Sequence, residues 1–170
     1  LKDVKTFVNA GMKVNQVGKT SEGYGWTPLI AAAYYEHFQI VQYLIKKRAD
    51  PNIALDSNGW NALHYAASWN KKDTKVIELL LSNMTLDINK KDSYRRTPLD
   101  CAYKYNRSLL YLGIIDLMRS KGALRAQEIL IKQYKEEFKG ANPLVVACEI
   151  GNLKDVKTFV NAGMKVNQVG

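Results

Sequence analysis

The chain has few of the side chains from which most catalytic and metal centres are built. Among 170 residues there are two histidines and two cysteines, and no cluster of them has the spacing of a zinc site. Two cysteines do not make a disulfide framework, so we expect Cys101 and Cys148 to be buried, reduced thiols. This favours an intracellular, cytoplasmic protein, although a fragment need not show a signal peptide and secretion stays open.

Long apolar runs and an acidic excess are absent as well. No run approaches the roughly 18 apolar residues of a membrane helix, so we expect no membrane span. Basic side chains number 25 against 16 acidic ones, which gives a net charge of +9. They fall in short pairs and not in one run. Non-specific binding of nucleic acid is therefore the weaker interpretation, and a solvated surface is the default.

The chain ends with the same residues with which it begins. Residues 1–18 and residues 153–170 both read LKDVKTFVNAGMKVNQVG, which defines a period of 152 residues. An identity of this length is not a coincidence. Either the chain is one period plus an overlap from a longer tandem array, or the overlap was introduced deliberately.

A shorter repeat lies within that period. Four segments begin with a Thr-Pro-Leu-like motif: WTPLIAAAYYEH, WNALHYAASWNK, RTPLDCAYKYN and ANPLVVACEIGN. Their threonine-equivalent residues are Thr27, Asn61, Thr97 and Asn142, at intervals of 34, 36 and 45 residues. The next threonine of the long period would follow after 37 residues, so four short repeats fill the period.

Each segment has the residues of a helical hairpin. A hydroxyl or amide side chain can cap the free N–H groups at the start of a helix, and proline is tolerated directly after it. Small residues such as those at 31–33 then allow close helix packing. A second apolar pattern follows at helical spacing, for example Ile40, Val41 and Leu44. One such hairpin cannot bury its apolar face alone, so stacked hairpins must share a core.

These motifs resemble the ankyrin repeat. The best-matching stretches are GWTPL, IVQYLI and ADPN in one repeat, and NGWNALHYAA and VIELLL in the next. The resemblance implies an all-α solenoid of stacked helix-turn-helix units with short hairpin-like loops. It divides a single stack over residues 1–170 into half a repeat at 1–18, repeats at 19–54, 55–90 and 91–123, a joining helix at 124–139, and a full repeat at 140–170 that duplicates 1–18.

Residues 124–139 depart from the repeat pattern. The sequence LRAQEILIKQYKEEFK has no hairpin motif, but its apolar side chains fall on one face of a helix. We expect an amphipathic helix that joins one four-repeat block to the next and packs on the stack. A partner-binding helix is the alternative. The apolar stripe comprises Leu124, Leu130, Ile131, Tyr134 and Phe138.

Nothing in the sequence indicates an enzyme. The glycine-rich stretch EGYGW at residues 22–26 has no phosphate-binding pattern around it, and we expect no cofactor and no metal. The family resemblance gives His64 a structural role, because the histidine of the Thr-Pro-Leu-His motif ties neighbouring hairpins together by hydrogen bonds.

The resemblance also predicts a surface for binding proteins. In ankyrin stacks the hairpin tips and the first helices line a groove that binds partners. The matching positions here are rich in Tyr, Trp and Arg, the residues that anchor interfaces. The alternative is that these rings only pack repeat against repeat. The predicted partner-binding residues are Tyr24, Trp26, Tyr34, Tyr35, Ser57, Asn58, Trp60, Trp69, Tyr94, Arg96, Lys104 and Tyr105.

We therefore expect a non-enzymatic scaffold that binds an acidic or aromatic-poor protein partner of unknown identity. The alternative is a structural or elastic filament, because identical blocks related by one repeated operation generate an extended superhelix. The helix expected at residues 2–9 lacks a partner helix and exposes Val4, Phe7 and Val8. That exposure favours head-to-tail association between molecules.

Overall fold

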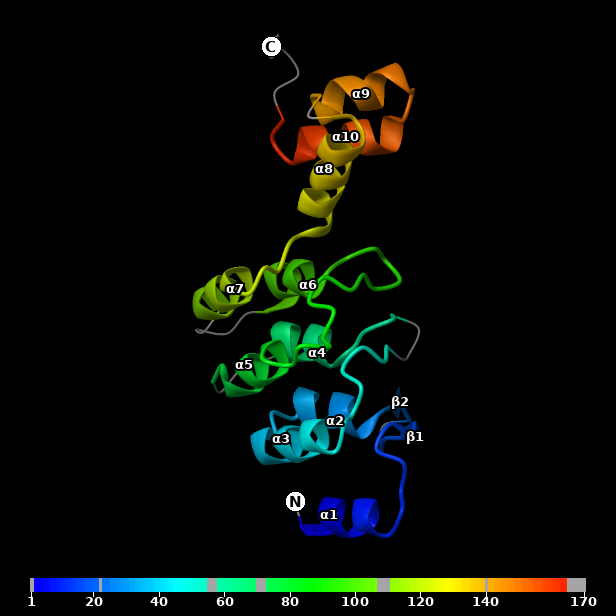
Figure 1. Cartoon of the computed structure of the whole chain (residues 1–170), viewed down its shortest axis with the longest axis vertical. Coiled ribbons are helices and arrows are strands. Elements are labelled where there is room, and N and C mark those ends of the chain that lie inside the picture. Colours follow the sequence, from blue (N-terminus) through cyan, green and yellow to red (C-terminus); the bar gives the residue numbers. More distant parts are fainter. Residues whose placement is uncertain are drawn as a thin grey trace. The chain divides into compact units, whose positions relative to one another are not determined.

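The computed structural model describes residues 2–21, 23–54, 58–69, 73–106, 111–139 and 141–164 (Figure 1). Helices joined by loops make up almost all of the described chain, with one two-stranded ribbon. The all-α repeat fold predicted from the sequence is confirmed. None of the helices in the described part has the length and apolar content needed to cross a membrane.

The chain forms two compact units, Leu1–Leu124 and Arg125–Gly170. The single stack over the whole chain stays a prediction. The elements of the first unit are α1 (Lys2–Asn9), β1 (Gly18–Lys19), β2 (Gly25–Trp26), α2 (Pro28–Tyr34), α3 (Phe38–Lys46), α4 (Ala62–Trp69), α5 (Lys75–Leu81), α6 (Pro98–Tyr105) and α7 (Tyr111–Ser120).

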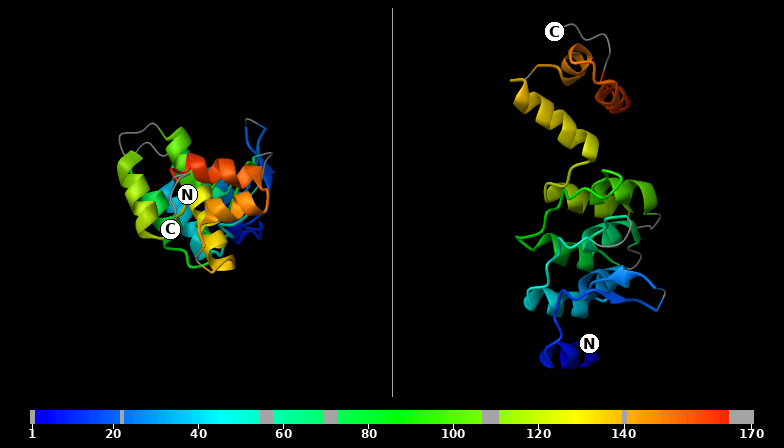
Figure 2. Two further views of the ribbon diagram at one scale, coloured as in Figure 1. Left: turned by 90° about the horizontal axis from the view of Figure 1, so that it is seen from above. Right: turned by 90° about the vertical axis from the view of Figure 1, so that its right-hand side faces the viewer.

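Helical hairpins stack in two columns within the first unit. The first helices, α2, α4 and α6, pack on one another in one column, and the second helices, α3, α5 and α7, pack in the other. The two columns lie side by side in Figure 1, and the right-hand view of Figure 2 shows the hairpins stacked one above another. The antiparallel ribbon of β1 and β2 forms one hairpin tip beside α2.

The predicted helix starts are confirmed. Thr27 caps α2 by accepting a hydrogen bond from the Ile30 N–H at 3.2 Å. Thr97 caps α6 in the same way, and the Asp100 carboxylate accepts from the Thr97 N–H in return, which completes a capping box. These caps fix where each first helix begins, and hence the phase of the repeats.

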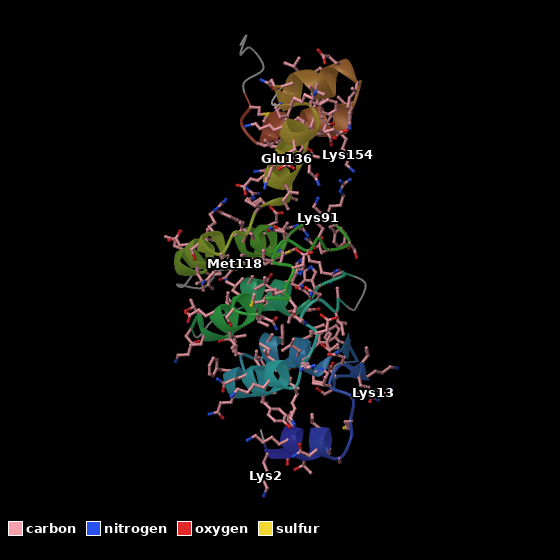
Figure 3. The ribbon with its side chains drawn as sticks, viewed as in Figure 1. Lys2, Lys13, Lys91, Met118, Glu136 and Lys154 are labelled. Atoms are coloured by element: carbon pink, nitrogen blue, oxygen red, sulfur yellow. The ribbon has the colours of Figure 1, made fainter. Side chains whose placement is uncertain are left out.

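A continuous apolar core fills the space between the two columns. Small side chains, Ala32, Ala66 and Ala102, are buried on the first helices, where they allow close packing. Figure 3 places Met118 on α7, and its side chain is fully buried. The other large, fully buried side chains of this unit are Leu29, Ile30, Leu44, Leu63, Ile77, Leu80, Leu99, Ile114, His64 and Val41.

Three asparagines tie consecutive repeats together at the loops. Asn15, Asn52 and Asn89 follow one another at intervals of 37 residues. The side-chain oxygen of each accepts a hydrogen bond from a backbone N–H 35 residues further along the chain. The donors are Asp50, Asp87 and Leu124, at 2.9, 2.7 and 2.7 Å.

The second unit contains α8 (Ala126–Glu137), α9 (Pro143–Glu149) and α10 (Leu153–Asn161). The amphipathic helix predicted at residues 124–139 is present as α8. Leu124 precedes this helix and belongs to the first unit. The rest of the predicted stripe packs with α9 and α10, so this apolar face is covered within its own unit. The cluster consists of Tyr134, Leu144, Val146, Ala147 and Phe159, with Leu130, Ile131 and Phe138 packed against it.

The two cysteines lie in different environments. Cys101 on α6 is buried, as predicted, but Cys148 on α9 is exposed, so the prediction of two buried thiols is wrong for Cys148. The reason is their place in the repeat. Cys101 has its equivalent in Val146 of α9, which is buried, whereas Cys148 has its equivalent in Tyr103 of α6, which is exposed.

Candidate functional site: an aromatic groove

The hairpin tips and first helices of the first unit line an open groove of about 540 Å³. Its walls come from β2, α2, α4 and α6 and from the loops that precede α4 and α6. We call it the aromatic groove, because rings form most of its lining. The lining residues are Tyr24, Trp26, Tyr34, Asn58, Trp60, Tyr65, Trp69, Tyr94, Arg96, Lys104 and Tyr105.

The structure brings together nearly all of the residues predicted for this surface. Among the described ones, Tyr35 alone is not part of the lining, and its ring lies 6.0 Å from the ring of His37. Ser57 lies outside the described residues. Tyr65 lines the groove although the sequence motif does not predict it. Its place within a run of small and apolar residues is typical of packing and hides this role.

Two buried tryptophans form the floor of the aromatic groove. Trp26 and Trp60 are each 5% exposed. The ring of Tyr65 lies between them, with centroids 5.1 Å from Trp26 and 5.0 Å from Trp60 and edge-to-face geometry at both contacts. Such pairs stabilise the packing beyond their buried area. These two tryptophans therefore pack within the stack and form the floor of the groove at the same time.

Exposed rings form the rim of the same groove. Tyr24, Trp69 and Tyr94 remain 49%, 42% and 65% exposed. Tyr24 stacks on Trp26 with centroids 5.3 Å apart and planes 12° apart, so the rim is held by the floor. The rim thus leaves large parts of three aromatic rings exposed.

Arg96 is fixed in the wall of the groove. Its Nε and Nη2 atoms donate to Asp92 Oδ2 at 2.8 and 2.6 Å, and Nη1 donates to the Tyr105 hydroxyl. The guanidinium carbon lies 4.7, 5.3 and 5.9 Å from the ring centroids of Tyr94, Tyr105 and Trp60. These are cation–π distances. A bound molecule would therefore meet Arg96 as part of a preformed wall.

Asp92 organises this wall from behind. Its buried carboxylate accepts hydrogen bonds from Trp60 Nε1 at 3.0 Å and from the backbone N–H groups of Tyr94 and Arg96 at 2.8 Å each. Burial by itself would raise the pKa of Asp92. The hydrogen bonds from Arg96 and Trp60 outweigh that effect and hold the pKa below its ordinary value. Because Asp92 neutralises Arg96, exposed Lys104 supplies the net positive charge of the groove.

His64 lies beneath the groove and not in it. The ring is fully buried, and burial lowers the pKa of His64 to about 4, so the ring is neutral near pH 7. Its Nδ1 lies 2.7 Å from Asn61 Oδ1, and its Nε2 lies 3.4 Å from the carbonyl oxygen of Arg96 in the next hairpin. The predicted structural role of His64 is confirmed. Within the described ranges, no three His, Cys, Asp or Glu residues form a possible metal site.

Comparison with known proteins points to one family. The model of ankyrin repeats, in three copies, matches residues 2–92 and 55–123. The chain is 29% identical over 130 residues to FPV223 of fowlpox virus (strain NVSL), described as an ankyrin repeat protein, and this match covers 76% of the chain and 80% of the relative.

Larger proteins match over most of the chain as well. Rabankyrin-5 of Mus musculus is 29% identical over 168 residues, which is 94% of the chain but 13% of that protein. The protein lin-12 of Caenorhabditis elegans is 28% identical over 160 residues, or 93% of the chain and 11% of the relative. With its stacked hairpins and the matching family model, the chain belongs to the ankyrin repeat family.

Proposed function

We propose that the aromatic groove binds a segment of another protein and that the chain is a non-enzymatic interaction scaffold. Ankyrin repeats generally mediate protein–protein interaction. The observation that carries the proposal for this groove is a rim of exposed rings above a buried floor. The floor rings Trp26 and Trp60 are covered, whereas Trp69 and Tyr94 stay exposed at an open groove.

The charges of the groove favour an acidic partner. Arg96 and Lys104 are the cations of the lining, and Asp92 compensates the first of them. One positive charge is left, over the ring of Tyr105 at 5.1 Å. A carboxylate of the partner would pair with Lys104 while its aliphatic side chains lie against the rim. A cytoplasmic location, which two free thiols favour, is part of the same proposal.

The test compares three baits of residues 1–170 in quantitative capture from a cell lysate. They are the wild type, the groove variant Trp69→Ala/Tyr94→Ala, and the matched control Tyr103→Ala/Leu112→Ala. The control also removes two exposed apolar side chains, 38% and 71% exposed, but from outside the lining. We expect the groove variant to bind the captured partner at least tenfold more weakly, as is typical for interface anchors, and the control to bind it like the wild type.

Two results would contradict the groove as the binding site. One is equal affinity of all three baits for the partner, measured by calorimetry with the purified proteins. The other is an equal loss for the groove variant and the control. Circular dichroism of each bait shows beforehand that the helices are intact. Lys104→Glu adds a check on charge, because it should weaken binding of an acidic segment and reduce the salt dependence of the affinity.

A second function is favoured by the repeated sequence at the two ends of the chain. Residues 1–18 and 153–170 are identical, which fits one period of a tandem array whose blocks form an extended superhelix or spacer. Small-angle scattering of a three-period protein tests this candidate. A rod-like scattering profile, with a length proportional to the number of periods, supports the array. The profile of flexibly linked beads contradicts it.

A further inference from the structure

The same sequence forms a helix twice in this chain, in two different settings. α1 and α10 both contain KDVKTFVN, and Figure 3 labels one equivalent pair, Lys2 on α1 and Lys154 on α10. Phe7 and Phe159 are likewise equivalent, because residue 1 recurs as residue 153. Phe7 is 55% exposed, whereas Phe159 is fully buried. Local sequence cannot cause this difference, so the neighbours of each helix must.

The neighbours of α10 are α8 and α9. The Phe159 ring packs edge-to-face on Tyr134, with centroids 5.0 Å apart, and lies in one cluster with Leu144 and Ala147 of α9. The Tyr134 hydroxyl donates to Asp155 Oδ2 at 2.7 Å. Each α10 residue that packs here has an identical counterpart in α1. The surface of α8 and α9 therefore fits α1 as well as it fits α10.

An open apolar groove lies beside α1, whereas α10 has α9 packed beside it. The groove holds about 370 Å³ and lies between α1 and the start of α2. Its lining includes Val4, Phe7, Val8, Met12, Pro28 and Ala31. On the other side, α9 exposes Val145 (47%), an apolar side chain that α8 and α10 leave uncovered. Both the groove and Val145 of α9 thus offer uncovered apolar surface.

We propose that α1 of one molecule replaces α10 on the α8–α9 surface of a second copy of this chain, and that α9 of that copy then fills the groove beside α1. Because α1 and α10 have the same sequence, α1 packs on that surface as α10 does, and the exchange itself is nearly neutral. Covering the groove between α1 and α2 adds burial of apolar surface, which favours the exchanged form. Each molecule has one donor helix and one acceptor surface, so the exchange builds open chains.

The concentration at which the exchange happens depends on competition from α10 of the acceptor molecule. α10 is tethered to its own α8 and α9, which corresponds to an effective concentration on the order of millimolar. The wild type therefore stays largely monomeric at micromolar concentration and associates as its concentration approaches that range. The inference does not depend on the aromatic groove, which uses other residues, so either proposal can fail without the other.

The decisive experiment places the same substitution in the two copies of the sequence. Phe159→Asp weakens α10 and frees the α8–α9 surface, so at roughly 50 µM, well below the millimolar tether, we expect a weight-average mass at least twofold above the 19.2 kDa monomer. Phe7→Asp removes the donor and should stay monomeric even at the highest concentration. Sedimentation velocity measures both.

The double variant Phe7→Asp/Phe159→Asp is the control for unfolding. If Phe159→Asp associates only because its second unit unfolds, the double variant associates equally, and the proposal is overturned. If α1 drives association, the double variant is monomeric. Association of the wild type near millimolar concentration that Phe7→Asp leaves unchanged would also overturn it.

A peptide measurement keeps the proposal testable if Phe159→Asp fails to fold. A labelled peptide of residues 1–18 is added to the wild-type chain, and fluorescence anisotropy reports binding. We expect binding that weakens at least tenfold when the peptide carries Phe7→Asp. Equal binding of the two peptides, or no binding of either at millimolar protein, contradicts the exchange.

Discussion

Asp92 accepts a hydrogen bond from the indole nitrogen of Trp60, 3.0 Å away and 32 residues earlier in the chain. The bond joins the loop before α6 to the floor of the aromatic groove. We expect Asp92→Asn to lower the free energy of unfolding by about 3 kcal/mol, because it leaves Arg96 without its buried counter-charge. Urea denaturation at pH 7 measures this. Asp73→Asn is the control, since it removes a surface ion pair with Lys75 and should cost less than about 1 kcal/mol.

The contribution of Asp92 also has a defined pH window. Its pKa in the folded state is depressed, so the stabilisation is complete above the ordinary carboxyl value of about 4. It is lost as the pH falls through the folded-state pKa. The difference between the wild type and Asp92→Asn should therefore be constant from pH 5 to 7 and shrink in stronger acid. A difference that grows on acidification would contradict the assigned ion pair.

His64 should make the stability of the fold depend on pH at higher pH values than Asp92 does. Burial lowers the pKa of His64 from 6.5 to about 4, so the unfolded chain takes up a proton in this interval and the folded chain does not. Stability is therefore highest above pH 6.5 and falls towards pH 4, by about 3 kcal/mol in total for this group. Urea denaturation of the wild type and His64→Gln between these values checks it. If NMR shows that the His64 imidazole titrates near pH 6.5, the assignment of a lowered pKa to His64 is refuted.

The floor and the rim of the aromatic groove should respond differently to truncation. Trp60 is 5% exposed and Trp69 is 42% exposed. We expect Trp60→Ala to cost about 3–5 kcal/mol of stability, as for other large-to-small core changes, and Trp69→Ala to cost less than about 1 kcal/mol. Chemical denaturation measures both. If the rim variant is as destabilised as the floor variant, Trp69 serves packing, and the groove loses its main anchor.

Arg48 holds a backbone conformation that suits glycine. Its φ is +61°, in the turn after α3, and Gly11, Gly122 and Gly163 occupy the same place after α1, α7 and α10 with φ of +92°, +87° and +84°. The side chain is exposed. Arg48→Gly should raise the unfolding free energy by about 1 kcal/mol, because it relieves the left-handed penalty. Thermal denaturation measures the gain, and Arg48→Ala, which keeps a Cβ, should show none.

Much of the fold can be read from the sequence because its signals are local. The caps at Thr27 and Thr97 act on N–H groups a few residues away, and the apolar spacing of each second helix reflects its own buried stripe. The rim positions follow from the repeat phase in the same way. Features of the fold that are set by such local signals can therefore be predicted from the sequence.

Features that depend on the neighbours of an element escape the sequence. Tyr65 lies in the middle of α4, and its role in the groove depends on how α4 crosses the adjacent helices. The asparagine bonds at 15, 52 and 89 join loops 35 residues apart. Each of these needs the tertiary arrangement, which no short pattern contains.

The asparagine bonds also have a mechanical consequence. Each bond joins one repeat only to the next. Among the described residues, no asparagine of this series bonds across two boundaries between repeats. Under a load along the stack these boundaries act in series, so each carries the full load, and one boundary can open while the others hold. The first unit should extend in discrete steps under tension, with the repeat as the unit of length released.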